Sequence, residues 1–160
     1  MKLWLITVGK TGSMLQPAVA EYEARARRYW QLEIVEVKEE RSGHGVSKDD
    51  VREAEAERLL KRVPADTELV ALTRRGDAWG SDRFAALLQR ATVQGHPGFA
   101  FVIGGSYGLS DDLLRQAQRR MRLSAFTLPH DLARLVLVEQ LYRAGTIARG
   151  EPYHKGRAEP

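Results

Sequence analysis

The fold of this chain is indicated most clearly by the segment Phe99-Ala100-Phe101-Val102-Ile103-Gly104-Gly105-Ser106-Tyr107-Gly108-Leu109-Ser110. Its first five residues are all apolar, which is the pattern of a parallel strand buried on both faces. Gly104 and Gly105 then allow the backbone to come close to another group, because glycine has no Cβ. Ser110 is a typical residue at the start of a helix, since its side-chain oxygen can accept a hydrogen bond from a free amide of the first turn. A strand that leads through a glycine turn into a helix is a building unit of α/β sheets.

Short β-rich runs alternate with helical segments over the rest of the chain as well. Strands are predicted at residues 3–8, 32–37, 68–73, 99–103 and 123–128. Helices are predicted at residues 15–29, 48–62, 81–94, 111–120 and 132–148, and Ser47, followed by Asp49 and Asp50, is a second typical helix start. The alternation predicts one domain, residues 1–160, built on an open, mostly parallel α/β sheet with its ligand at the carboxyl ends of the strands.

The composition narrows the class of protein. With 43% hydrophobic and 29% charged residues, the chain of 160 residues is typical of a folded globular protein. It has no cysteine, which excludes disulfides, thiolate metal ligands and cysteine nucleophiles. The apolar N-terminal run stops at Val8, too early for a signal peptide, and no run approaches the roughly 20 apolar residues of a membrane span. We therefore expect a cytoplasmic protein with no membrane association and no metal.

Positive charge is concentrated in the C-terminal third. The net charge is +4, yet residues 113–160 alone carry nine Lys or Arg against four Asp or Glu, a local balance of +5. Such a concentration is expected of a protein that binds a polyanion, because each neutralised phosphate releases counterions. A solvated basic surface is the alternative, and charge alone leaves both open.

The glycine turn at Gly104 and Gly105 is the first segment that can carry chemistry. A dinucleotide-binding fingerprint would need G-x-G-x-x-G in the first strand-helix unit, whereas these glycines are spaced differently and follow the fourth strand. The spacing therefore disfavours a nucleotide-dependent oxidoreductase. An ordinary strand-to-helix turn uses glycine as well, so a ligand site is not the only interpretation.

The C-terminal third contains three more such segments. The run 123–128 ends in Pro129-His130, and a proline there leaves neighbouring backbone groups free to meet a ligand. In the following helix Glu139 and Arg143 are four residues apart and can pair on one face. The tail 149–157 places an aromatic ring and an imidazole among three cations, which are groups that stack a base and hold its phosphates. A solubilising end is the alternative for this tail.

Together, these motifs resemble the ribosomal large-subunit RNA methyltransferase H family, small bacterial enzymes of the SPOUT class. The motifs are Ile103-Gly104-Gly105 with Gly108-Leu109-Ser110, Leu123-Ser124-Ala125 with Thr127-Leu128-Pro129-His130, Glu139-Gln140 with Leu141-Tyr142-Arg143-Ala144, and Pro152-Tyr153-His154-Lys155. Their order along the chain is more specific than any one of them. The resemblance implies a mostly parallel sheet flanked by helices, a C-terminal deep trefoil knot and a homodimer.

The resemblance also implies an activity, methyl transfer from S-adenosylmethionine to N3 of pseudouridine 1915 in 23S ribosomal RNA on the assembled ribosome. The cofactor would be held, largely by backbone groups, at Leu72, Gly105, Ser124, Ala125, Phe126, Thr127, Leu128 and Pro129. The catalytic positions would be Arg143, Tyr153 and His154, bordering the target base across the dimer interface.

For the reaction itself, we expect Arg143 and Tyr153 to position the base while His154 orients it or accepts the N3 proton. Arg143 or Lys155 could stabilise the resulting anion. The alternative is a non-catalytic RNA-binding module of ribosome assembly, which would have no reason to bind S-adenosylmethionine.

Overall fold

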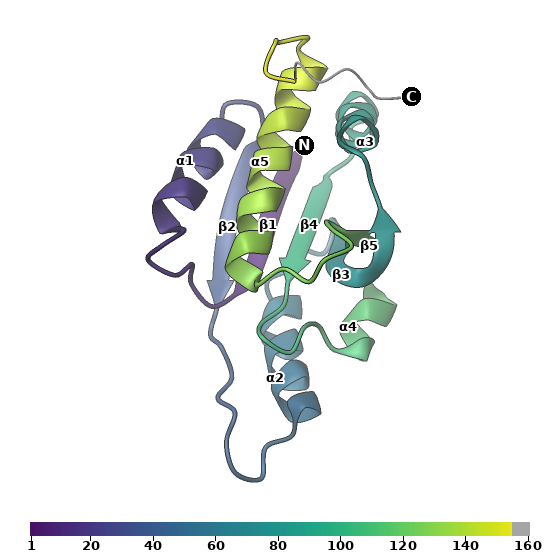
Figure 1. Ribbon diagram of the computed structural model, residues 1–160. Helices are drawn as coiled ribbons and strands as arrows, with labels where there is room; N and C mark the ends of the chain where they lie inside the picture. The colour runs from purple at the N-terminus through teal and green to yellow at the C-terminus, as the bar shows by residue number, and fades with distance from the viewer. Residues whose placement is uncertain (155–160) are drawn as a thin grey trace.

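Five parallel strands form one sheet in the order β2-β1-β4-β3-β5 in the computed structural model, which describes residues 1–154 (Figure 1). The strands are β1 (Lys2–Val8), β2 (Gln31–Val37), β3 (Glu68–Ala78), β4 (Gly98–Ile103) and β5 (Arg119–Arg122). The helices are α1 (Gln16–Ala26), α2 (Lys48–Leu60), α3 (Ser81–Val93), α4 (Asp111–Gln116) and α5 (His130–Ala148). The predicted α/β class with a parallel sheet is confirmed.

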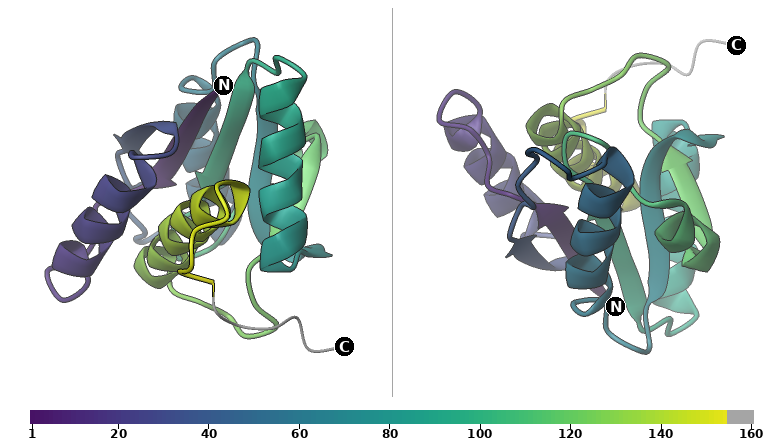
Figure 2. Two further views of the ribbon diagram at one scale, coloured as in Figure 1. Left: turned by 90° about the horizontal axis from the view of Figure 1, so that it is seen from above. Right: turned by 90° about the horizontal axis from the view of Figure 1, so that it is seen from below.

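Helices cover both faces of this sheet (Figure 2). Phe99, Phe101 and Ile103 of β4 pack in one core cluster with buried residues of α1, α3 and α5. Ala100 and Val102 of the same strand pack in a second cluster with buried residues of α2 and α4. Because neighbouring side chains of a strand point to opposite faces, a strand with two covered faces must be apolar throughout. This explains the continuous apolar run that the sequence shows.

The predicted helix starts are confirmed. Ser47 caps α2, with its Oγ accepting a hydrogen bond from the Asp50 amide at 3.0 Å, while the Asp50 carboxylate accepts one from the Ser47 amide at 2.9 Å. Ser110 caps α4 by accepting a hydrogen bond from the Leu113 amide at 3.2 Å. These bonds satisfy amides that have no partner inside the helix.

The strand predicted at residues 123–128 is wrong. The fifth strand is Arg119–Arg122, the helix before it ends at Gln116 instead of residue 120, and residues 123–129 form an irregular loop that leads into α5. β5 pairs only with β3, so it lies at the edge of the sheet, where cationic side chains remain in water and discourage further pairing. The more apolar run 123–128 has no strand partner among residues 1–154 and instead contributes to a cavity.

β3 is longer than the predicted strand 68–73, because it returns to β5 after an irregularity. Leu72 and Asp77 both pair with Met121, so the residues between them lie across β5. The glycine at position 76 allows the backbones of β3 and β5 to approach closely, because a Cβ at this position would lie 2.6 Å from the backbone nitrogen of Met121. The crossing brings residues 73–76 to the carboxyl end of the sheet, beside the loop 123–129.

Candidate active site

A cavity of about 690 Å³ opens at the carboxyl ends of β3, β4 and β5. Its size is within the range of small-molecule sites, and its position is where open parallel sheets bind their ligands. The residues that line it come from the end of β3 and its crossing (Leu72, Thr73, Arg74, Arg75), from the glycine turn (Ile103, Gly104, Gly105, Ser106, Tyr107, Gly108, Leu109), from the loop after β5 (Leu123, Phe126, Thr127, Leu128) and from helices (Lys48, Arg52, Leu114, His130, Ala133).

The structure brings most of the predicted cofactor residues to this cavity. Leu72, Gly105, Phe126, Thr127 and Leu128 line it, whereas Ser124, Ala125 and Pro129 belong to the same loop without lining it. Within residues 1–154, Phe126 is the only residue of 124–128 whose backbone has a hydrogen bond to the protein, its amide donating to Ser124 Oγ at 2.9 Å. The loop therefore offers free backbone donors and acceptors to a ligand.

The glycine turn forms a tightly packed wall of the cavity. The Gly108 amide donates to the Gly105 carbonyl at 3.0 Å, and a Cβ on Gly104 would lie 2.7 Å from the carbonyl carbon of Gly108. A Cβ on Gly105 would lie 2.9 Å from Glu55 Oε1. Gly104 is thus required by the packing of the turn against its own backbone, whereas Gly105 packs closely against the Glu55 carboxylate of α2.

Glu55, in α2, is a residue of this site that the motifs do not reveal. Its side chain is buried, with the residue 2% exposed; Oε2 accepts a hydrogen bond from the Glu40 amide at 3.2 Å, and Oε1 has no partner within the described chain. Burial raises the pKa of this carboxyl group. The available signal was periodicity, because Val51, Glu55 and Leu59 are four residues apart and share the buried face of the helix.

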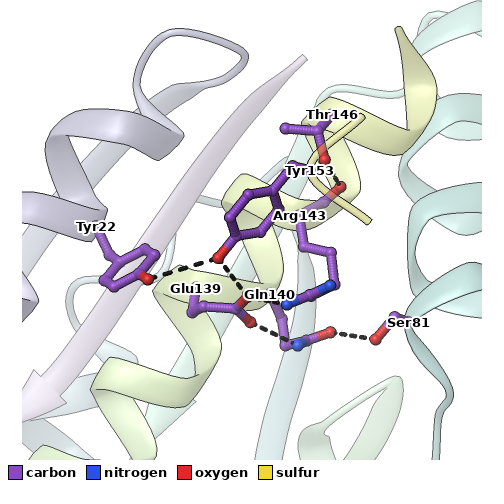
Figure 3. A network of polar contacts seen from close by, with 7 residues as sticks. All are labelled: Tyr22, Ser81, Glu139, Gln140, Arg143, Thr146 and Tyr153. Atoms are coloured by element: carbon purple, nitrogen blue, oxygen red, sulfur yellow. Dashed lines mark hydrogen bonds and ion pairs between the residues drawn. The ribbon is translucent and has the colours of Figure 1, made fainter. Parts of the chain in front are cut away.

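The predicted catalytic residues lie at the other end of α5, where Glu139 holds two of them (Figure 3). Glu139 Oε1 accepts hydrogen bonds from Arg143 Nε at 3.0 Å, from Arg143 Nη2 at 2.6 Å and from the Tyr153 hydroxyl at 3.0 Å. The Arg143 guanidinium also lies 4.9 Å from the centre of the Tyr153 ring. The predicted pairing of Glu139 with Arg143 is confirmed, and it is part of a larger network that includes Tyr22.

These contacts set the protonation of the network. The hydrogen bond with Glu139 raises the pKa of Arg143, which remains a cation. Burial, followed by hydrogen bonds with Tyr22 and Glu139, raises the pKa of Tyr153, so its phenol stays protonated at neutral pH and acts as a donor. His154 lies next in the chain, and its Nδ1 is buried without a partner among residues 1–154. Lys155, the other predicted cation, lies outside the described residues.

One chain does not bring the two groups of predicted residues together. His130, the first residue of α5, lines the cavity, whereas Arg143 is thirteen residues beyond it along the helix. At 1.5 Å per residue the separation is about 20 Å along the axis. Figure 1 shows α5 extending from the carboxyl ends of the strands toward the opposite end of the sheet.

Two further findings for residues 1–154 describe the class of site. No three or more His, Cys, Asp or Glu side chains in this range are grouped so that they could hold a metal ion. None of its helices combines the length and apolarity that a membrane span requires. The polar groups that line the cavity are backbone groups, hydroxyl groups, cations and one imidazole.

Comparison with known proteins identifies the family. The family model described as "Predicted SPOUT methyltransferase" matches residues 1–154. A protein of Gemmatimonas aurantiaca named ribosomal RNA large subunit methyltransferase H is 48% identical over 156 residues, which cover 97% of this chain and 100% of that protein. A protein of the same name from Syntrophotalea carbinolica is 44% identical, with coverage of 96% and 99%.

Solved structures show the same fold at low sequence identity. A probable methyltransferase from Bordetella pertussis Tohama I superposes with a TM-score of 0.52 at 19% identity, covering 89% of this chain and 95% of that one. A probable methylase family protein from Haemophilus influenzae Rd KW20 superposes with a TM-score of 0.55 at 13% identity, covering 99% and 71%. The near full-length sequence relationships are more specific than these likenesses of fold. The chain therefore belongs to the SPOUT methyltransferases, in the family of ribosomal RNA large subunit methyltransferase H.

Proposed function

We propose that this protein uses S-adenosylmethionine to methylate N3 of pseudouridine 1915 in 23S ribosomal RNA, acting in the cytoplasm on the assembled ribosome. The observation that carries the proposal is the cavity at the carboxyl ends of β3, β4 and β5. Its glycine turn and the free backbone groups of residues 124–128 suit a ligand with an apolar ring system and several polar groups. Bound there, S-adenosylmethionine supplies an electrophilic methyl carbon, and the protein supplies alignment, which can account for about 7–11 kcal/mol of the barrier.

The network at the far end of α5 is proposed to handle the base. N3 of the base must lose its proton before it can attack the methyl carbon, and a nearby cation such as Arg143 stabilises the resulting anion. The Tyr153 hydroxyl remains protonated and donates to Glu139, so it cannot accept the proton, and its ring is proposed to orient the base. His154, whose Nδ1 has no hydrogen-bond partner among residues 1–154, is the remaining group of the three and is proposed to accept the proton or to orient the base.

A second copy of the chain is proposed to complete the site. The separation of about 20 Å between the cavity and Arg143 is too large for one nucleotide base to contact both within one chain. In a homodimer the cavity of one chain would face the Arg143 and Tyr153 of the other. The deep trefoil knot implied by the family belongs to the same proposal.

Two measurements test this function together. Calorimetry should detect S-adenosylmethionine binding to the purified protein. Ribosomal particles that lack the modification should then gain one methyl group on one pseudouridine of their 23S RNA, detected by mass spectrometry, and should react faster than the naked RNA. A protein that binds the particles without binding the cofactor would be an RNA-binding module instead. A methyl group placed elsewhere would refute the proposed target.

A further inference from the structure

The mouth of the cavity carries four cationic side chains from two separate elements. Lys48 and Arg52 come from the first two turns of α2, and Arg74 and Arg75 come from the crossing after Leu72. No Asp or Glu is among the residues of the described chain that line the cavity. We call these four residues the cationic rim. Charges of one sign that line a cleft raise the local concentration of ligands of the opposite sign.

S-adenosylmethionine does not account for the cationic rim. This cofactor carries a sulfonium and an ammonium group against a single carboxylate, so it is itself a net cation. Four positive side chains around its cavity therefore favour a different, anionic partner at the same opening.

The cationic rim is available to such a partner. Lys48 and Arg74 are exposed; Lys48 lies 5.6 Å from the centre of the Tyr107 ring, and Arg74 donates to Thr127 Oγ1 at 2.9 Å. Arg52 pairs with Asp49 at 3.0 Å and Arg75 with Asp111 at 3.4 Å, and in both pairs the aspartate is exposed. Exposed pairs of this kind contribute little to stability, so a phosphate can replace them. Lys48 also lies in the first turn of α2, where the helix dipole adds to the positive potential.

Two aromatic rings beside the cationic rim favour RNA over other anions. Phe126 is 82% exposed and Tyr107 is 36% exposed, and both line the cavity. Large apolar rings left in water next to cations are suited to stacking unpaired bases whose phosphates the cations hold. A free phosphate ion or an acidic protein segment would have no comparable use for both rings.

We propose that the cationic rim holds the phosphates of the ribosomal RNA strand on either side of the target nucleotide, with Tyr107 or Phe126 stacking a neighbouring base. The inference rests on the proposed function, because it assigns the RNA strand at the cavity to the methylation substrate. It places RNA contacts in the N-terminal half of the chain, at Lys48 and Arg52, in addition to the basic C-terminal third.

The test compares two double variants that each remove two positive charges. Lys48→Gln with Arg52→Gln removes half of the rim, whereas Lys61→Gln with Arg62→Gln removes the same charge from two exposed residues that directly follow α2. Binding of each protein to purified large ribosomal particles is measured between 50 and 200 mM salt, and S-adenosylmethionine binding is measured by calorimetry. Each contact to a phosphate of a single strand adds about 0.7 to the slope of log Kd against the logarithm of the salt concentration. The rim variant lacks two such contacts, so its slope should be lower by about 1.4.

The rim variant should also show a raised KM for particles, and this change should be larger than any change in its affinity for S-adenosylmethionine. Arg74→Gln with Arg75→Gln should behave in the same way. The proposal is overturned if the rim variants match the Lys61 and Arg62 control, or if they lose cofactor affinity in parallel with particle binding. The unmodified protein could bind particles in a salt-dependent way that the rim variants weaken, yet transfer no methyl group. This result would refute the proposed function and would still support RNA binding by the cationic rim.

Discussion

Replacing Glu139 by glutamine should loosen the network at the far end of α5 and slow methyl transfer without touching the cavity. The substitution keeps the shape of the side chain and removes the charge that accepts two hydrogen bonds from Arg143 and one from Tyr153. Hydrogen bonds to charged groups contribute about 1.5–3 kcal/mol each and neutral ones about 0.5–1.5, so each bond weakens by about 1 kcal/mol. The Arg143 and Glu139 side chains are 29% and 19% exposed, so water screens part of this loss.

We therefore expect the free energy of unfolding to fall by about 1–2 kcal/mol, which lowers Tm by roughly 3–6 °C for a chain of this size. Methyl transfer should fall about 10- to 100-fold, because Arg143 and Tyr153 are no longer held in place. S-adenosylmethionine affinity should stay within about twofold, since the cavity lies about 20 Å away along α5.

Thermal unfolding, calorimetry with the cofactor and a methylation assay on ribosomal particles measure these three quantities. Glu57→Gln is the matched control, because Glu57 forms the same i,i+4 pair with Lys61 on the surface, where the side chains are 69% and 70% exposed. Such an exposed pair contributes little to stability. The reasoning is refuted if Glu139→Gln and the control unfold at the same temperature, or if Glu139→Gln transfers methyl groups at the unmodified rate.

Two further substitutions test the packing and the buried charge. Gly145→Ala would place a Cβ 2.3 Å from Cγ of Tyr29, so we expect the free energy of unfolding, measured in urea, to fall by about 1–3 kcal/mol. Gly43→Ala is the control and should be neutral, because no atom of residues 1–154 lies within 4 Å of its new Cβ. Equal urea midpoints for the two variants would contradict the close packing of α5 on Tyr29. Because burial raises the pKa of Glu55, the folded chain binds this proton more tightly than the unfolded chain, and stability should fall as pH rises from below the ordinary value of 4.5 through the raised one. Glu55→Gln should flatten this dependence and be the more stable form at neutral pH; urea midpoints between pH 4 and 8 that fall equally in both proteins would contradict it.

The parts of the fold that were predicted correctly depend on local chemistry. The strand 99–103 is apolar because both of its faces are buried, and the caps at Ser47 and Ser110 use side chains next to the amides they satisfy. The residues that form β5, in contrast, are determined by the position of this strand in the sheet. At an edge its side chains remain charged, so periodicity favoured the more apolar run 123–128.

The residues of the candidate site also differ in whether the sequence could predict them. Motifs indicated Gly105 and the loop after β5, and the structure brings them to one cavity with Leu72. Glu55 was missed because a glutamate on a polar helix usually faces water, although its spacing from Val51 and Leu59 pointed inward. The position of the cavity at the N-terminal end of α5 could not be predicted either, because it depends on the direction in which α5 crosses the sheet.

The central claim is that the cavity of one chain acts with the C-terminal residues of a partner, and a mixed dimer tests it most directly. Thr127→Trp fills the cavity of one chain and Arg143→Ala disables the network of the other, and the two are co-expressed with different affinity tags so that the heterodimer can be purified. Each homodimer should be inactive on ribosomal particles. The heterodimer should recover about half of the unmodified rate, because a twofold dimer keeps one of its two shared sites intact. A heterodimer as inactive as the two homodimers would contradict the claim.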